Sequence, residues 1–302
     1  MIDPVALRSL VAVERLGSVG AAATALEYTP SAVSQQIKRL ESQTGVQLLE
    51  RRGRGILLTE AGRSLTESAR DLLAEMERLE ARVRGIEGQP VGSVRLAVFA
   101  TAYRGILPGV LERLRARAPG VVLKADEIDP FEAVDAVAAG SHDLAVVHNW
   151  EPLPLAIPTH LESRHVGRDV ADVIVHRTHR LADHRELSVE DVLDEEWVSV
   201  APGSICHQWL VKMFADVGRA PRIRHFAHEF ATHVALVGGG RVVALVPRLG
   251  RGELPGEVRA VPITQPVSAR TVSVLWRSTM GTSPALNAVV DALSAESVAA
   301  LA

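Results

Sequence analysis

Residues 18–41 constrain the fold of this chain more than any other stretch. Their sequence is SVGAAATALEYTPSAVSQQIKRLE, two short helical patterns separated by a break at Glu27 and Tyr28. The alanines of the first pattern are small enough for a second helix to cross close to it. Thr29 suits an N-cap and Pro30 a first helical position, because proline has no amide hydrogen to lose there. We therefore predict two helices joined by a tight turn, the second beginning at about Pro30.

The second of these helices has an apolar and a polar face. Val33, Ile37 and Leu40 recur at helical spacing and should face the first helix. The outward face carries short hydrogen-bonding side chains, namely Ser31, Ser34, Gln35 and Lys38. Such side chains can match the donors and acceptors that base edges present in the DNA major groove. The pattern predicts a recognition helix, with an ordinary surface helical hairpin as the alternative.

A basic hairpin is expected directly after this helix. Two strand-like pieces at 46–49 and 56–58 flank the sequence Arg51-Arg52-Gly53-Arg54-Gly55, in which the glycines allow a tight turn. Arginines at such a tip can reach phosphates or the minor groove. We expect a wing beside the helix-turn-helix, and a solvated basic turn is the alternative.

A long helix should follow from residues 59–62. Its apolar residues repeat with the spacing of a heptad seam for about three heptads and have charged residues on either side. The seam consists of Leu58, Leu65, Ala69, Leu72, Met76, Leu79, Val83 and Ile86. Pairing of two such helices would position two DNA-binding units on a two-fold symmetric operator. The seam predicts a dimer, and packing onto its own chain is the alternative.

The run LRSLVAVERLGSVGAAATALEYTPSAVSQQIKRLESQTGVQLLERRGRGILLTEAG resembles the N-terminal domain of LysR-type transcriptional regulators. The resemblance implies that Thr29, Pro30, Ser31, Ser34 and Gln35 face bases or backbone in the major groove. It implies phosphate or minor-groove contacts for the basic side chains Lys38, Arg51, Arg52 and Arg54. It also implies double-stranded operator DNA as partner and a homodimer that assembles into a homotetramer. Position 30 often carries glutamine in the family and position 35 arginine, so this chain's base preference should differ.

Composition places any DNA contact at the N-terminal end. The net charge of the whole chain is −3, whereas the first 63 residues carry eight basic and six acidic groups. The start lacks a signal-peptide pattern, there is no long apolar run, and Cys206 is the only cysteine. We expect a cytoplasmic protein with no membrane partner.

Beyond a glycine- and proline-rich hinge, strand-like and helical stretches alternate, which is typical of a parallel α/β sheet. This part resembles the family's effector-binding domain, which is similar to the two-lobed periplasmic solute-binding fold. The expected fold class is α/β multidomain: a winged helix-turn-helix, a long linker helix and this two-lobed domain. The expected units are 1–59 for DNA binding, 60–87 for the linker, 88–93 for the hinge and 94–302 for the effector domain. Within the last, lobe one is 92–165 with 266–302, and lobe two is 166–265.

Ligands of such folds bind between the lobes, at the carboxyl ends of strands. Two strand-to-helix junctions there suit an anion: Ala100, Thr101 and Ala102 in lobe one, and Ser204 in lobe two. His148, Val246 and Pro247 lie at further strand ends. We expect a small, anionic effector at these residues, and capping or loop geometry is the alternative for each of them. Pro130 replaces a hydroxyl residue common in the family, which argues against aromatic-acid effectors.

Other functions have weaker support. A metal sensor would use His225 and His228, with His233 nearby, but the spacing does not put all three on one helix face. A redox sensor would use Cys206 beside His207, without a second cysteine to resolve it. The surroundings of Ser204 and of the three glycines at 238–240 match neither a hydrolase nor a phosphate-binding loop. We expect no enzyme activity, cofactor or metal.

Overall fold

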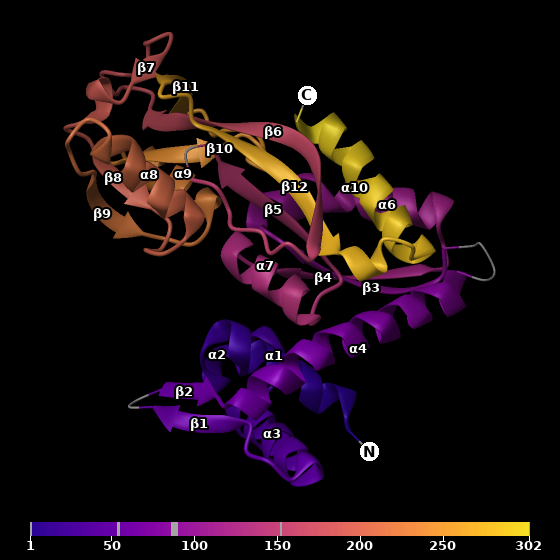
Figure 1. Cartoon of the computed structure of the whole chain (residues 1–302). Helices are drawn as coiled ribbons and strands as arrows, with labels where there is room; N and C mark the ends of the chain where they lie inside the picture. The colour runs from indigo at the N-terminus through magenta and orange to yellow at the C-terminus, as the bar shows by residue number, and fades with distance from the viewer. Residues whose placement is uncertain (1, 53–54, 86–89, 152, 302) are drawn as a thin grey trace.

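The computed structural model describes residues 2–52, 55–85, 90–151 and 153–301. A small helical unit at the N-terminus, here called the head, is joined by one long helix to a larger α/β unit, here called the sensor domain (Figure 1). Within the described residues, none of the helices is both long and apolar enough to span a membrane.

The head is built on three helices: α1 (Pro4–Leu16), α2 (Val19–Ala25) and α3 (Pro30–Thr44). Each begins at a side chain that accepts a main-chain N–H, since Asp3, Ser18 and Thr29 cap α1, α2 and α3 in turn. The predicted inner face of α3 is confirmed, because Val33, Ile37 and Leu40 are all buried in the core of the head. The sequence between 18 and 41 therefore forms the predicted helix-turn-helix.

The hairpin beside it pairs β1 (Leu49–Arg52) with β2 (Gly55–Leu58) in antiparallel register. The strand expected at 46–49 was placed too early, because β1 begins only at Leu49. The preceding segment is held otherwise: Glu41 accepts the N–H of Leu48, and Thr59 donates its hydroxyl to the carbonyl of Gln47. Of the predicted tip, Arg51 and Arg52 lie in β1, and Arg54 lies outside the described residues.

The long helix α4 (Glu60–Gly85) belongs to the head at one end and leaves it at the other (Figure 1). Ala69 is buried in the head core, and Leu65 and Leu73 pack against it. Gly62 lies so close to the chain before β1 that an added Cβ would stand 2.2 Å from the carbonyl oxygen of Leu48. Further along, Leu72 and Leu79 are half exposed. The first part of the predicted seam thus packs within its own chain, whereas Leu72 and Leu79 remain open to solvent.

One sheet of ten strands runs through the sensor domain. The main path has the order β4-β3-β5-β12-β6-β10-β8-β9, and β11 pairs with β6 and with β7. The strands are β3 (Gly92–Val98), β4 (Val121–Glu127), β5 (Leu144–Trp150), β6 (Leu161–His176), β7 (Leu187–Ser188), β8 (Glu196–Ser199), β9 (Arg222–Phe226), β10 (Val243–Pro247), β11 (Val258–Gln265) and β12 (Ala269–Arg277).

The prediction of a parallel sheet holds only toward its two ends. Strands β4, β3 and β5 are mutually parallel, as are β10, β8 and β9. In the middle, β12 is antiparallel to both β5 and β6, and β6 is antiparallel to β10 and β11. The prediction was wrong there because β6 and β12 are long strands that carry the chain from one half of the sheet to the other (Figure 1).

Helices cover both halves of the sheet. They are α5 (Ala100–Gly105), α6 (Leu107–Arg117), α7 (Pro130–Ala139), η1 (Glu190–Val192), α8 (Ile205–Ala215), α9 (Phe230–Gly238), η2 (Ser278–Met280) and α10 (Pro284–Leu301). Helices α5 and α6 are separate, because the chain breaks at Ile106. The element η1 is a single short turn. Gly92, which lies in the segment expected as a hinge, pairs with Val121 in the sheet.

The head also touches the sensor domain directly, where α7 lies against α1 and α2 (Figure 1). Arg15 on α1 donates to the main-chain oxygen of Asp135 on α7 at 2.6 Å and lies 3.3 Å from its carboxylate. Near the other end, α4 packs beside η2 and α10. The position of the head is therefore defined by two sets of contacts with the sensor domain, one through α1 and α2 and one through α4.

Candidate DNA-binding face and effector site

The outward face of α3 is open to solvent. Ser31, Gln35 and Lys38 are exposed, and Ser34 is half-buried. Ser34 donates its hydroxyl to the carbonyl of Pro30 at 2.8 Å, and the hydroxyls of Thr29 and Ser31 lie 2.9 Å apart. Among the described residues, Gln35 and Lys38 make no side-chain hydrogen bond or ion pair. These two side chains are free to meet DNA without first breaking a bond within the protein.

At the centre of the sensor domain, Arg270 and Asp169 form a fully buried ion pair. The guanidinium of Arg270 on β12 donates to Asp169 on β6 through Nε at 2.9 Å and lies 2.7 Å from it through Nη2. The same Nη2 donates to the hydroxyl of Thr101 on α5 at 2.6 Å. The other oxygen of Asp169 accepts the main-chain N–H of Leu249 at 3.0 Å. Both charges are thus paired and hydrogen-bonded, as burial requires.

Aromatic rings enclose this pair. Arg270 lies over the ring of Phe99 at 4.9 Å and over that of Trp150 at 5.9 Å. His148 meets Phe99 edge-on, and its Nε2 lies 3.9 Å from the sulfur of Cys206. Burial, together with the charge of Arg270, holds the pKa of His148 well below its ordinary value. The imidazole is therefore neutral at pH 7, which allows it to sit beside a buried arginine.

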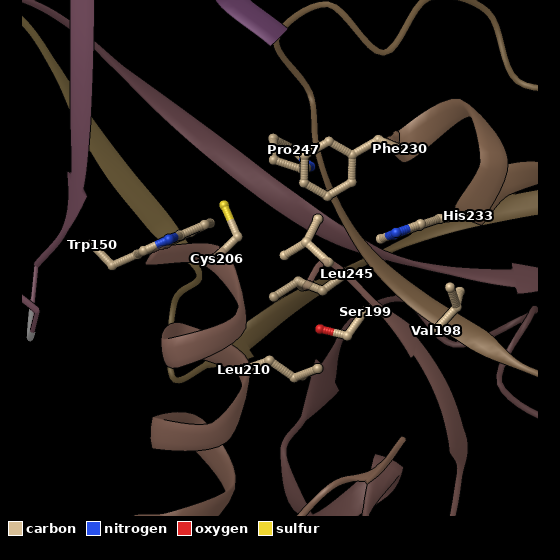
Figure 2. A pocket seen from close by; sticks show the side chains of 10 residues that line it. Trp150, Val198, Ser199, Cys206, Leu210, Phe230, His233, Leu245 and Pro247 are labelled. Carbon is tan, nitrogen blue, oxygen red and sulfur yellow. The ribbon is translucent and has the colours of Figure 1, made fainter. Parts of the chain in front are cut away.

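A small pocket opens next to this cluster, between Trp150 and the strands and helices of the other half of the sheet (Figure 2). Its lining is Trp150, Val198, Ser199, Val200, Cys206, Leu210, Phe230, His233, Leu245 and Pro247. The lining is mostly apolar. The indole N–H of Trp150 finds no oxygen or nitrogen acceptor among the described residues and faces the sulfur of Cys206, a weak acceptor.

The seven predicted effector residues fall in different surroundings. Pro247 lines the pocket, Thr101 and His148 lie behind it around Arg270, and Ala100 begins α5. Ala102 and Val246 are buried in the hydrophobic cores. Ser204 caps α8 by accepting the N–H of His207, and its hydroxyl donates to the carbonyl of Ala201. The capping alternative is therefore realised at Ser204, and an effector role for these residues stays a prediction.

Cys206 and His207 are neighbours in the sequence, but their side chains have different partners. The ring of His207 turns away to Ser199 at 3.2 Å and to Phe226, whereas the sulfur of Cys206 lies near His148. Burial raises the pKa of the Cys206 thiol to about 11. A thiol that stays protonated is a poor nucleophile, so the structure does not favour a redox function.

The alternative metal cluster does not assemble either. His225 and His228 are exposed, while His233 is buried and lies 2.9 Å from the main-chain oxygen of Ala227. Among the described residues, these histidines do not form a group with three ligand atoms in mutual reach.

The Arg270–Asp169 pair was missed by sequence reasoning. The available signal was charge within strands: Asp172 interrupts the apolar second half of β6 and Arg270 interrupts the pattern of β12, whereas Asp169 follows other charged residues of β6 and stands out less. All three are buried, and Asp172 is paired with Arg248 and Arg251. A charged residue inside an otherwise apolar strand indicates a buried ion pair, but not which partner it has.

Two family models together cover almost the whole chain. Residues 5–63 match the "Bacterial regulatory helix-turn-helix protein, lysR family", and residues 87–297 match the "LysR substrate binding domain". The chain belongs to the LysR family of transcriptional regulators. It is a DNA-binding regulator with an effector-binding domain, as its helix-turn-helix and two-part α/β domain indicate.

Individual relatives agree with this assignment. The HTH-type transcriptional regulator TtuA of Agrobacterium vitis is 28% identical over 244 residues, which are 80% of this chain and 79% of TtuA. A full-length OxyR variant from Pseudomonas aeruginosa has the same fold, with a TM-score of 0.68, 18% identity and coverage of 97% and 95% of the two chains. Full-length CbnR in complex with its target DNA gives a TM-score of 0.56 and 23% identity, with coverage of 98% and 99%.

We predict that Arg270→Met destabilises the sensor domain by about 3–5 kcal/mol, because it leaves Asp169 buried without its partner. Adding Asp169→Asn should restore much of that loss, since asparagine removes the charge and can still accept the N–H of Leu249. The matched control is Arg168→Met, which removes an exposed pair with Glu151 and should cost at most about 1 kcal/mol. Urea unfolding of the wild type and the three variants measures this, and an Arg270→Met variant no less stable than Arg168→Met would contradict it.

Proposed function

We propose that two copies of this chain pair through α4 and place two α3 helices on the half-sites of an operator. The units are those expected from the sequence: 1–59 for DNA binding, 60–87 for the linker and 94–302 for effector binding, in two lobes divided near 165 and 265. Two such dimers form a tetramer. The exposed leucines of α4 support this pairing, because apolar side chains at heptad positions gain most by packing against a second helix.

The face that would enter the major groove carries Ser31, Ser34 and Gln35, with Lys38 beside them. Gln35 is the side chain best suited to a base edge, since it is exposed and its amide can donate and accept at once. Thr29 and Pro30 begin the helix, whose N-terminal end suits a phosphate. Arg51, Arg52 and Arg54 would extend the contact to the minor groove or to phosphates. This placement resembles that of the family, and CbnR shows the fold in complex with DNA.

For the effector, the pocket supports a small molecule with an apolar body and one acceptor group. Trp150 offers an N–H that lacks a strong acceptor. Cys206 lines the pocket and lies in the first turn of α8, so this turn, next to Ser204, forms part of the pocket wall. Main-chain amides in a first helical turn have no partner within the helix and favour a carboxylate. We therefore propose an anionic effector that binds in the pocket with its charged group directed toward α8. Thr101 and His148 lie behind the pocket and would act indirectly, Thr101 through its hydrogen bond with Arg270 and His148 through its contact with Cys206.

The chain would act in the cytoplasm, and its function would be regulation without catalysis. Effector binding would change how the lobes pack and thereby the spacing of the two heads on DNA.

We predict that Gln35→Glu weakens operator binding at least about tenfold, because the new charge is repelled by the phosphates. Lys38→Ala should weaken binding to all sequences alike. It should also lower the slope of log affinity against log salt concentration by about one unit per head. Fluorescence anisotropy over a salt series, on a DNA fragment that the wild-type chain selects from genomic DNA, measures both. The control Gln43→Glu makes the same chemical change near the other end of α3 and should bind almost normally. Equal affinities for Gln35→Glu and Gln43→Glu would argue against this recognition face.

We predict that Leu245→Trp, which fills the pocket, abolishes stabilisation by the effector. A thermal-shift screen of small carboxylic acids against the wild-type chain identifies a ligand, which at about 100 times its Kd should stabilise by about 2.7 kcal/mol. Each variant is compared with its own unliganded melting temperature. Leu111→Trp, at an exposed position on α6, is the control and should keep the full shift. A ligand that still stabilises Leu245→Trp binds elsewhere, which would refute this placement.

A further inference from the structure

Three potential metal ligands meet where the head touches the sensor domain. Glu27 lies in the turn between α2 and α3, Asp126 near the end of β4, and His142 just after α7. The Nε2 atom of His142 is 3.2 Å from a carboxylate oxygen of Asp126 and 3.9 Å from one of Glu27. One ligand atom from each residue lies within 4.8 Å of the other two. The DNA-binding function uses none of these groups.

The side chain of Ser141 lies beside the remote ring nitrogen of His142. Its hydroxyl is 3.1 Å from the carbonyl oxygen of Ala136 and 3.3 Å from Nδ1 of His142, and Nε2 of His142 forms a hydrogen bond with Asp126 at 3.2 Å. In the tautomer with its proton on Nδ1, His142 donates to Ser141 and presents the lone pair of Nε2 to the two carboxylates, as a metal ion between them requires. Such a support on the remote nitrogen is usual for a metal-binding histidine.

The ring is also rigidly held. His142 is buried, and its main-chain oxygen accepts from Nη1 of Arg277 at 2.7 Å. By contrast, the side chains of Glu27 and Asp126 are mostly exposed, so an ion can reach them from water. The site therefore has one fixed nitrogen and two adjustable oxygens.

We propose that Glu27, Asp126 and His142 bind a divalent metal ion of the zinc class, with water as the remaining ligand. Zinc takes nitrogen and carboxylate oxygen ligands at about 2.0–2.2 Å, which in a tetrahedral site separates them by about 3.4 Å. The observed 3.2 and 3.9 Å need only small movements of the exposed carboxylates. The site differs from the histidine cluster at 225–233.

The metal would join the two parts of the chain. Glu27 has a left-handed backbone conformation, φ 58°, in the turn that leads into α3, while the other two ligands belong to the sensor domain. The Arg15–Asp135 contact lies on the same interface. A bound ion would fix the recognition helix relative to the sensor domain, so metal and DNA binding would be energetically coupled. This last consequence rests on the proposed function, whereas metal binding itself does not.

The test is isothermal titration of ZnCl₂ into the full-length, tag-free chain after treatment with chelator, without DNA. We expect one ion per chain, with Kd raised at least about tenfold by Glu27→Gln and by Asp126→Asn. His142→Ala should abolish binding, but it removes a buried side chain, so the two exposed carboxylate variants decide the outcome should it fail to fold. The control is the double variant His225→Ala/His228→Ala, which should bind like the wild type.

Absorption of the Co²⁺ form gives a second readout, because d–d bands of a tetrahedral ion should weaken in Glu27→Gln. Absence of uptake by the wild type would overturn the proposal. Uptake that is unchanged in Glu27→Gln would also overturn it, since the ion would then not join head and sensor domain. Neither result would affect the DNA-binding tests above.

Discussion

The arrangement of this protein depends on α4, because one helix contributes to the head core, contacts the sensor domain and leaves an apolar strip uncovered. Ala69, Leu65 and Leu73 complete a head that is otherwise three short helices and a hairpin. Such a small unit buries little apolar surface by itself, so a fourth helix matters for its stability. Beyond Ala69, the same seam exposes Leu72 and Leu79. The heptad pattern thus serves two purposes. One part of it packs within the chain, and another part is available to pair with a second chain.

Local signals predicted the head well. Capping residues, a first-turn proline and helical spacing act within a few residues of one another, and α2, α3 and the inner face of α3 were found where these signals put them. The sheet was less predictable. Whether β12 lies antiparallel to β5 and β6 depends on where the chain returns after more than a hundred residues, and no local pattern encodes that. The same holds for Arg270, whose partner Asp169 is 101 residues away.

The effector site shows a related limit. Reasoning from helix N-termini selected hydroxyls at Thr101 and Ser204, but both are used within the protein, one by Arg270 and one as a cap. The pocket is lined instead by apolar residues, Trp150, Phe230 and Leu245 among them, which are ordinary core residues by sequence. Arg270 connects the two sets, since it touches Thr101 and lies over Trp150. A ligand that moves Trp150 would therefore also disturb a buried charge, which is a physical route from the pocket to the crossover strands β6 and β12.

In the proposed assembly, the exposed part of α4 pairs two chains and thereby two recognition helices. Light scattering coupled to size-exclusion chromatography measures this pairing in the absence of DNA and effector. The wild-type chain should elute with two or four times the chain mass of 32.4 kDa, and Leu72→Asp/Leu79→Asp should reduce that mass at least by half. Glu67→Lys, a charge change on the far side of the same helix, should leave it unchanged. A double variant with the same mass as the wild type would contradict the claim.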